Sequence, residues 1–136
     1  FKFLVVDDNE INRRVLTKLL ENHIVYTARN GKEAVELFQK HQHESRTFDL
    51  IMMDIEMPVM NGLEATERIR ILENESNLEK QHQVSILAIT GNARSSEMDH
   101  ILQQGIDEII IKPINKSILF SALKKYLEFN PAFVDK

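Results

Sequence analysis

The chain has 136 residues, of which 43% are apolar and 28% are charged, and its formal net charge is −4. This length fits one domain that buries roughly two-thirds of its unfolded surface, and the acidic balance gives no support to nucleic-acid binding, which usually needs a basic face. The sequence has no apolar run near the roughly 18 residues of a membrane helix, no signal-peptide pattern, and no cysteine for a disulfide or a thiolate metal site.

Hydrophobic runs alternate with segments of helical periodicity along the chain. In chain order, the predicted segments are a strand at 2–7, a helix at 10–21, a strand at 24–28, a helix that starts at the turn 30–31, a strand at 50–53, a helix at 63–73, a strand at 84–90, a helix at 96–104, a strand at 108–111 and a helix at 116–129. Asn9 and Asn115 suit N-caps, and Gly105 suits a left-handed C-cap. Strands that alternate with helices predict an α/β fold with a parallel sheet and helices on both faces.

Other segments set the limits of the domain. The polar stretch 74–83 has no clear period, and we expect an exposed loop there. The chain begins at Phe1, already at the first strand and without an initiator methionine, so we expect a domain of a larger protein. We place that domain at residues 1–129 and treat 130–136 as a C-terminal tail or linker remnant. The last helix is expected to turn five apolar side chains inward, namely Ile118, Leu119, Ala122, Leu123 and Leu127.

Polar side chains follow four of the predicted strands at the point where each strand ends: Asp7 and Asp8, Asp54, Thr90, and Lys112. In an open parallel sheet all strand C-termini open onto one edge, where ligands bind. Carboxylates collect a hard divalent cation, while a hydroxyl and an ammonium donate to an oxyanion. This combination suits a phosphoryl group carried on an aspartate.

The acidic residues predict a metal site with oxygen ligands only. At a strand end the chain can turn, so that Asp8 binds the ion directly and Asp7 acts through water, and Asp54 joins them if the first and third strands are neighbours. With no His or Cys nearby, the ligands favour Mg²⁺ or Mn²⁺ over zinc. The alternative is that acidic residues after strands are solvated or serve as helix caps.

Asp54 is the best candidate nucleophile, because a carboxylate that attacks phosphorus forms an acyl phosphate. Lys112 precedes Pro113, and a tight turn there, with or without a cis bond, would aim the lysine into the crevice. Thr90 lies before the flexible Gly91, which favours a hydroxyl that can move toward a phosphoryl oxygen. The simpler readings are a β-branched packing residue at Thr90 and a solvated lysine at the end of a strand.

Four motifs carry a resemblance that spans nearly the whole chain: FLVVDDNEINRRVL, DLIMMDIEMPVMNGLEATERIR, ILAITGNA and GIDEIIIKPI. They are similar to the response-regulator receiver domains of hybrid sensor histidine kinases, and TGNAR points to a eukaryotic and more narrowly a fungal example. The resemblance implies a doubly wound, flavodoxin-like (βα)5 fold with the strand order 2-1-3-4-5 and five helices. It also implies a cytoplasmic phosphorelay domain that accepts a phosphoryl group from a phosphohistidine.

The resemblance assigns roles residue by residue. Asp54 becomes the phosphoacceptor, Thr90 the switch hydroxyl and Lys112 the phosphate-binding base. Mg²⁺ would be held by the side chains of Asp8 and Asp54 and the backbone carbonyl of Glu56, with Asp7 assisting. The phosphodonor would belong to a kinase dimerisation domain or a histidine phosphotransfer protein, and the candidate contact residues are Ile11, Asn12, Val15 and Pro113. Ile11 and Val15 could instead belong to the core.

The resemblance also marks a departure and leaves alternatives open. The family often has a Tyr or Phe two residues before the lysine, where this chain has Ile110, which puts an aromatic rotamer switch there in doubt. The side chains of Glu56 and Asn92 flank the predicted site and are expected to tune the attack of water on the acyl phosphate. A different class is a Mg²⁺-dependent aspartyl-phosphate phosphatase for small phosphate esters, in which Glu56 would be the second acid. A third is an interaction module that keeps the fold without the chemistry.

Overall fold

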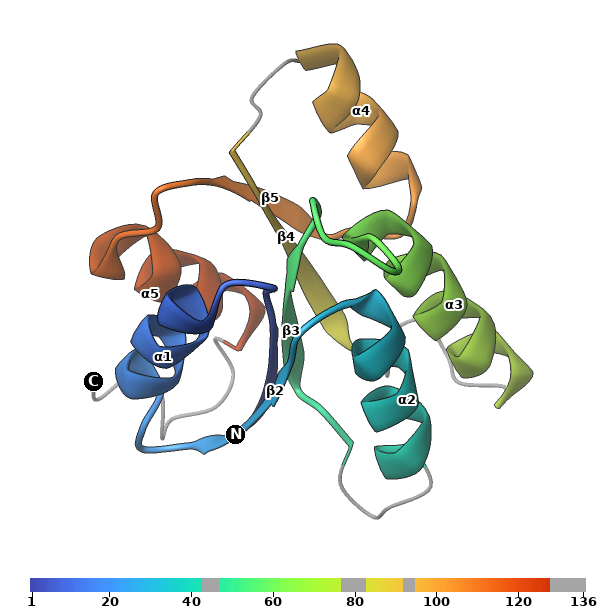
Figure 1. Cartoon of the computed structure of the whole chain (residues 1–136), viewed down its shortest axis with the longest axis horizontal. Helices are drawn as coiled ribbons and strands as arrows, with labels where there is room; N and C mark the ends of the chain where they lie inside the picture. The colour runs from blue at the N-terminus through green and yellow to red at the C-terminus, as the bar shows by residue number, and fades with distance from the viewer. Residues whose placement is uncertain (43–46, 77–82, 92–94, 128–136) are drawn as a thin grey trace.

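The computed structural model describes residues 1–42, 47–76, 83–91 and 95–127. Within them strands and helices alternate strictly (Figure 1). In chain order the elements are β1 (Lys2–Val6), α1 (Glu10–Leu19), β2 (Ile24–Ala28), α2 (Gly31–His41), β3 (Leu50–Asp54), α3 (Gly62–Glu75), β4 (Ser85–Thr90), α4 (Ser95–Gln103), β5 (Glu108–Ile111) and α5 (Lys116–Tyr126).

The strands form one parallel sheet in the order β2-β1-β3-β4-β5, which confirms the expected fold class. β1 and β3 are neighbours and pair Val6 with Met53. β3 and β4 pair Asp54 with Ile89. The chain therefore brings the residues that follow β1, β3 and β4 to one edge of the sheet, where the predicted site lies.

Each face of the sheet is covered by its own helices (Figure 1). On one face Phe3, Val5 and other strand residues pack against α1 and α5. On the opposite face Leu4, Val6 and their neighbours pack against α2, α3 and α4. Because consecutive strand residues point to opposite faces, a strand buried on both faces is apolar throughout. β1 and β3 meet this condition, with every residue buried.

Asparagine begins four of the helices. The side-chain oxygens of Asn9, Asn30, Asn61 and Asn115 each accept a hydrogen bond from the backbone N–H three residues later. This contact satisfies a donor that has no partner within the helix. The predicted caps at Asn9 and Asn115 are confirmed, and Gly105 has the positive φ of 99° expected of a left-handed C-cap.

The sequence misplaced several boundaries and one core residue. α1 ends at Leu19 instead of residue 21, α3 continues to Glu75 into the expected loop, and Asp54 is the last residue of β3. Ile118 was expected to face inward but is 46% exposed. The inward positions of α5 are Leu119, Ala122 and Leu123, and Ile118 is turned by about 100° from Leu119. Residues 77–82 of the loop expected at 74–83, the predicted end of the last helix and the tail lie outside the described residues.

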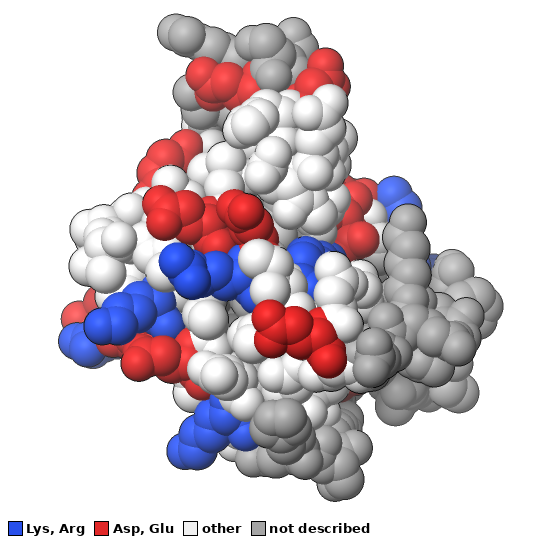
Figure 2. All heavy atoms as spheres, turned by 90° about the vertical axis from the view of Figure 1, so that its right-hand side faces the viewer, with Lys and Arg blue, Asp and Glu red and all other residues white. Residues whose placement is uncertain are grey.

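The surface carries charges of both signs. On the face over α2, α3 and α4, acidic and basic side chains lie side by side among the described residues (Figure 2). Within the described part of the chain, no helix combines the length and the apolar character that crossing a bilayer requires.

Candidate functional site

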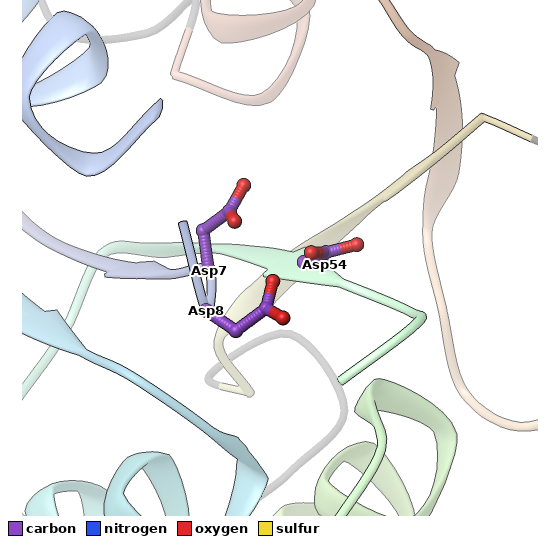
Figure 3. A group of neighbouring side chains, drawn as sticks. All are labelled: Asp7, Asp8 and Asp54. Carbon is purple, nitrogen blue, oxygen red and sulfur yellow. The ribbon is translucent and has the colours of Figure 1, made fainter. Parts of the chain in front are cut away.

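Three carboxylates meet at the C-terminal edge of the sheet (Figure 3). Asp7 and Asp8 follow β1, and Asp54 ends β3. Each offers an oxygen atom, and these atoms lie within 4.8 Å of one another. Asp7 and Asp54 are buried whereas Asp8 is exposed. The neighbouring positions of β1 and β3 thus create the predicted acidic cluster, whose oxygen ligands fit Mg²⁺.

Asp54 is held in an environment that disfavours its charged form. Its side chain is 1% exposed, and apart from the Lys112 ammonium no donor among the described residues reaches either carboxylate oxygen. Burial, followed by the negative charge of Asp7, raises the pKa of Asp54 to about 6, against the opposing pull of the Lys112 ammonium. A cation at this cluster would lower the cost of ionising Asp54, so the residues present fit a divalent metal.

Asp7 is fixed by four contacts. Its carboxylate accepts hydrogen bonds from the backbone N–H of Asn9 at 2.8 Å and from the side-chain amide of Asn12 at 3.3 Å. Its backbone carbonyl accepts from Arg13 at 2.7 Å, and its N–H donates to the carbonyl of Ala28 at 3.1 Å. The first turn of α1 therefore sets the position of the acidic pair, which the sequence did not reveal.

Lys112 extends from the end of β5 toward Asp54. Its ammonium nitrogen lies 3.3 Å from Oδ1 of Asp54, and its backbone N–H donates to the carbonyl of Thr90 at 2.8 Å. The Lys112–Pro113 peptide bond is cis, which is one of the two forms that the sequence left open for this turn. The arrangement places a positive charge beside the carboxylate that would carry a phosphoryl group.

Thr90 is buried at the end of β4, with an exposed fraction of 1%. Its hydroxyl donates to Oε1 of Glu56 at 2.6 Å. The register that pairs Asp54 with Ile89 brings Ile55, the first residue after β3, level with Thr90, so the next residue, Glu56, lies beside the end of β4. The sequence placed Thr90 and Glu56 at the site but did not predict this bond, which the strand order and register together could have suggested.

The loop between β3 and α3 is closely packed against the site. A Cβ atom at Gly62 would collide with the backbone carbonyl of Asp54, and a Cβ at Gly31 would lie 2.5 Å from the carbonyl of Met60. The N–H of Gly31 donates to that same carbonyl at 2.9 Å. Val59 in this loop has a φ of 69° and is 77% exposed. A β-branched residue pays a steric penalty in this left-handed region.

The predicted partner residues lie beside the site. Asn12, Val15 and Pro113 line a groove of about 470 Å³, together with Asp7, Leu16, Leu19, Lys112 and Ile114. Val15 is 52% exposed, and Ile11, on the same helix, is 69% exposed. Neither residue belongs to the core, which removes the alternative reading of this face of α1.

Ile110 lies two residues before Lys112, where the resemblance leads one to look for an aromatic side chain. Ile110 is 3% exposed and packs in the cluster under α1 and α5. The neighbouring Ile109 packs on the opposite face with Ile101 of α4. The aliphatic side chain at position 110 therefore belongs to the core, and the doubt about an aromatic rotamer switch at this position stays a prediction. Asn92, the other predicted flanking residue, lies outside the described residues.

The family model of the response regulator receiver domain matches residues 3–124. The chain is 34% identical over 136 residues to hybrid signal transduction histidine kinase I of Dictyostelium discoideum, a match that covers 95% of this chain and 8% of that protein. It is 36% identical over 126 residues to two-component system protein A of Emericella nidulans, which covers 90% of this chain and 17% of that protein. The chain therefore spans less than a fifth of the length of these two relatives.

Solved structures show the same fold. The receiver domain of sensor histidine kinase PA1611 from Pseudomonas aeruginosa PAO1, with magnesium in its active site cleft, has a TM-score of 0.75 and 29% identity, and the match covers 93% of this chain and 97% of that one. The receiver domain of Saccharomyces cerevisiae Ssk1, in a co-crystal with the histidine phosphotransfer protein Ypd1, has a TM-score of 0.82 and 29% identity, with coverages of 93% and 88%.

Proposed function

This chain belongs to the response regulator receiver domain family, and from that membership we propose that Asp54 accepts a phosphoryl group from a phosphohistidine in a Mg²⁺-dependent reaction. The observation that carries the proposal is the state of Asp54. It is a buried carboxylate inside an acidic cluster, and among the described residues it meets the Lys112 ammonium at 3.3 Å but no other donor. Such a group is poised to bind a cation and to act as a nucleophile.

The transfer exchanges one bond to phosphorus for another. An oxygen of Asp54 attacks the phosphorus atom, the P–N bond of the phosphohistidine breaks with its electron pair going to the imidazole, and an acyl phosphate forms on Asp54. Lys112 then pairs with a phosphoryl oxygen, and the Thr90 hydroxyl donates to another. A bound Mg²⁺ supplies positive charge that offsets the repulsion between the carboxylates and the phosphoryl oxygens.

The proposed metal ligands are the side chains of Asp8 and Asp54 and the backbone carbonyl of Glu56, with Asp7 assisting. The hydrogen bonds that Asp7 already accepts from Asn9 and Asn12 support the assisting role. The exposed carboxylate of Asp8 has room to bind an ion directly. We propose Mg²⁺ as the natural ion and Mn²⁺ as a substitute, because both accept oxygen ligands in an octahedral arrangement.

The proposed protein partner is a histidine phosphotransfer protein or a kinase dimerisation domain. The groove lined by Asn12, Val15 and Pro113 adjoins the site, and Ile11 adds exposed apolar surface. The similarity to a receiver domain solved with a phosphotransfer protein supports the first partner. We further propose that residues 1–129 form a cytoplasmic receiver domain and that residues 130–136 are a tail. By similarity to its curated relatives, we place this domain within a hybrid histidine kinase.

Intact-mass spectrometry tests the chemistry directly. After incubation with Mg²⁺ and acetyl phosphate, the wild type should gain one phosphoryl group, and Asp54→Asn or excess EDTA should prevent the gain. A stable absence of the adduct and of phosphate release in the wild type would contradict the proposal. Steady hydrolysis of a generic phosphate ester would favour the phosphatase alternative instead.

A pair of surface variants tests the partner surface. Val15→Glu should slow transfer from a phosphorylated histidine phosphotransfer domain about tenfold or more, because it places a charge in the apolar groove. The same variant should leave labelling by acetyl phosphate unchanged. Ile71→Glu, on α3 and 48% exposed, is the matched control and should change neither rate. If both variants slowed the phosphotransfer equally, the groove would not be the surface that binds the partner.

A further inference from the structure

The hydroxyl of Thr90 has one proton, and in this structure that proton is given to Glu56. The oxygen atoms lie 2.6 Å apart, the length of a hydrogen bond from a hydroxyl to a charged carboxylate. A hydroxyl can donate to only one acceptor at a time. Any other oxygen that needs this donor must therefore compete with the carboxylate of Glu56.

We propose that Glu56 restrains the activated state of this domain by holding the Thr90 hydroxyl away from the phosphoryl position on Asp54. The inference rests on the proposed function, since it concerns what happens once a phosphoryl group is on Asp54. Phosphorylation then requires an exchange of acceptors, from the Glu56 carboxylate to a phosphoryl oxygen. The free energy of the lost bond reduces the fraction of phosphorylated molecules in which Thr90 is engaged.

The positions of the two residues make the exchange a local event. Thr90 has a fixed backbone, because it ends β4 and its carbonyl accepts from the N–H of Lys112 at 2.8 Å. The side chain of Glu56 is exposed and leaves Thr90 by rotating into solvent. Among the described residues, a Cβ placed at the following Gly91 would meet no heavy atom within 4 Å apart from its chain neighbours. The Thr90 side chain can change acceptor without a rearrangement of the sheet.

Charge gives Glu56 a second effect that must be separated from the first. The Glu56 carboxylate raises the pKa of Asp54 through their like charges, though less than burial and Asp7 do. It would repel an anionic phosphoryl group in the same way, whether or not Thr90 has a hydroxyl. A double-mutant cycle separates the two effects, since only competition for the proton depends on Thr90.

The probe is beryllofluoride with saturating Mg²⁺, a phosphoryl mimic that binds at the acceptor carboxylate, and its affinity is measured from backbone NMR shifts. Glu56→Ala removes the competing acceptor and keeps the backbone carbonyl proposed as a metal ligand. Thr90→Val keeps the buried, β-branched shape without the hydroxyl. We expect Glu56→Ala to tighten beryllofluoride binding about tenfold in the wild-type background, the order of a charge-assisted hydrogen bond. In the Thr90→Val background the gain should fall to about twofold.

Glu56→Gln refines the result because it removes the charge and keeps an oxygen acceptor. The affinity of Glu56→Gln for beryllofluoride should lie between the affinities of the wild type and of Glu56→Ala. The inference is overturned if Glu56→Ala has the same effect with and without the Thr90 hydroxyl, or if it leaves binding unchanged or weaker. Failure of the proposed function gives a different result, in which the wild type binds no beryllofluoride and forms no adduct at Asp54.

Discussion

The two ends of the sheet treat buried charge in opposite ways. At the C-terminal edge Asp54 is buried, and within the described residues its carboxylate meets the Lys112 ammonium at 3.3 Å and no other donor. At the opposite edge Arg70 of α3 is 16% exposed at its side chain and is fully engaged. Its guanidinium donates to the carbonyls of Gly105 at 2.8 Å and Val84 at 2.7 Å, and to the carboxylates of Glu73 at 2.7 Å and Asp107 at 3.1 Å.

The other members of the Arg70 network are satisfied as well. Glu73 is 1% exposed and also accepts from the N–H of Val84 at 2.7 Å. Asp107 accepts from the N–H of Ile86 at 2.8 Å. These bonds join α3 to the start of β4 and to the turn before β5. Satisfied buried charges hold a fold together, whereas an unsatisfied one marks a place that binds something else.

Backbone conformation repeats the contrast. Both ends need a residue with positive φ, and the structural end uses Gly105 at 99° whereas the functional end uses Val59 at 69°. Glycine adopts this region without a steric penalty, but valine does not. The loop beside Asp54 therefore keeps a strain that the opposite end avoids, which is common near functional sites.

The largest expected effect on stability comes from disrupting the Arg70 network. Arg70→Met should lower the free energy of unfolding by about 3–5 kcal/mol, because it leaves the buried Glu73 carboxylate and two carbonyls without their main donor. Urea denaturation measures the change. Arg68→Met, an exposed position on the same helix, is the control and should stay within about 0.5 kcal/mol of the wild type. Equal stability of the two variants would contradict the structural role of the network.

The unsatisfied end should respond in the opposite direction. Without metal at pH 7.5, Asp54→Asn should be more stable than the wild type by up to about 3 kcal/mol, the value for a pKa raised from 3.8 to about 6. Because the folded state holds its proton more tightly than the unfolded chain, wild-type stability falls as the pH rises from about 4 to about 6 and stays low above. Asp54→Asn should lose this dependence. Asp99→Asn, exposed on α4, should retain it.

Bound metal should restore much of the folding stability that the buried charge of Asp54 costs. Free Mg²⁺ at about 100 times its dissociation constant should stabilise the wild type by about 2.7 kcal/mol at pH 7.5. The gain should shrink below pH 6, where protons compete for Asp54, and in Asp8→Asn, which removes a proposed ligand. Thermal unfolding with and without EDTA measures it. An undiminished gain in Asp8→Asn would place the ion elsewhere.

The smallest expected effect concerns the strained loop. Val59→Gly should stabilise the fold by about 1 kcal/mol, because relief of the positive-φ penalty exceeds the entropy that glycine adds to the unfolded chain. Val59→Ala, which keeps the Cβ, should give less. The matched change at the other end, Gly105→Ala, should destabilise by about 1 kcal/mol or more, since its Cβ would also lie 3.0 Å from the Arg70 side chain. If Val59→Gly lowered the stability of the fold, the backbone at Val59 would not be strained in the way proposed.

Much of the fold followed from local patterns. Apolar strands, helical periodicity and asparagine caps were sufficient for the alternation of elements, because each depends on neighbours within a few residues. The meeting of Asp54, Thr90 and Lys112 at one site followed from the rule that the C-terminal ends of parallel strands lie at one edge of the sheet. Ile118 was misplaced because α5 buries a narrower stripe than its apolar residues suggested.

The sequence by itself determined the parallel α/β fold and the residues at the site, because both depend on spacing along the chain. Only the tertiary structure decided which partner each charged group meets. It gave the Thr90 proton to Glu56, surrounded Arg70 with acceptors and left Asp54 with the Lys112 ammonium as its one donor among the described residues. These pairings join residues far apart in the chain, such as Arg70 and Asp107, and their distances follow from strand register and helix packing. Neither is encoded in any local pattern.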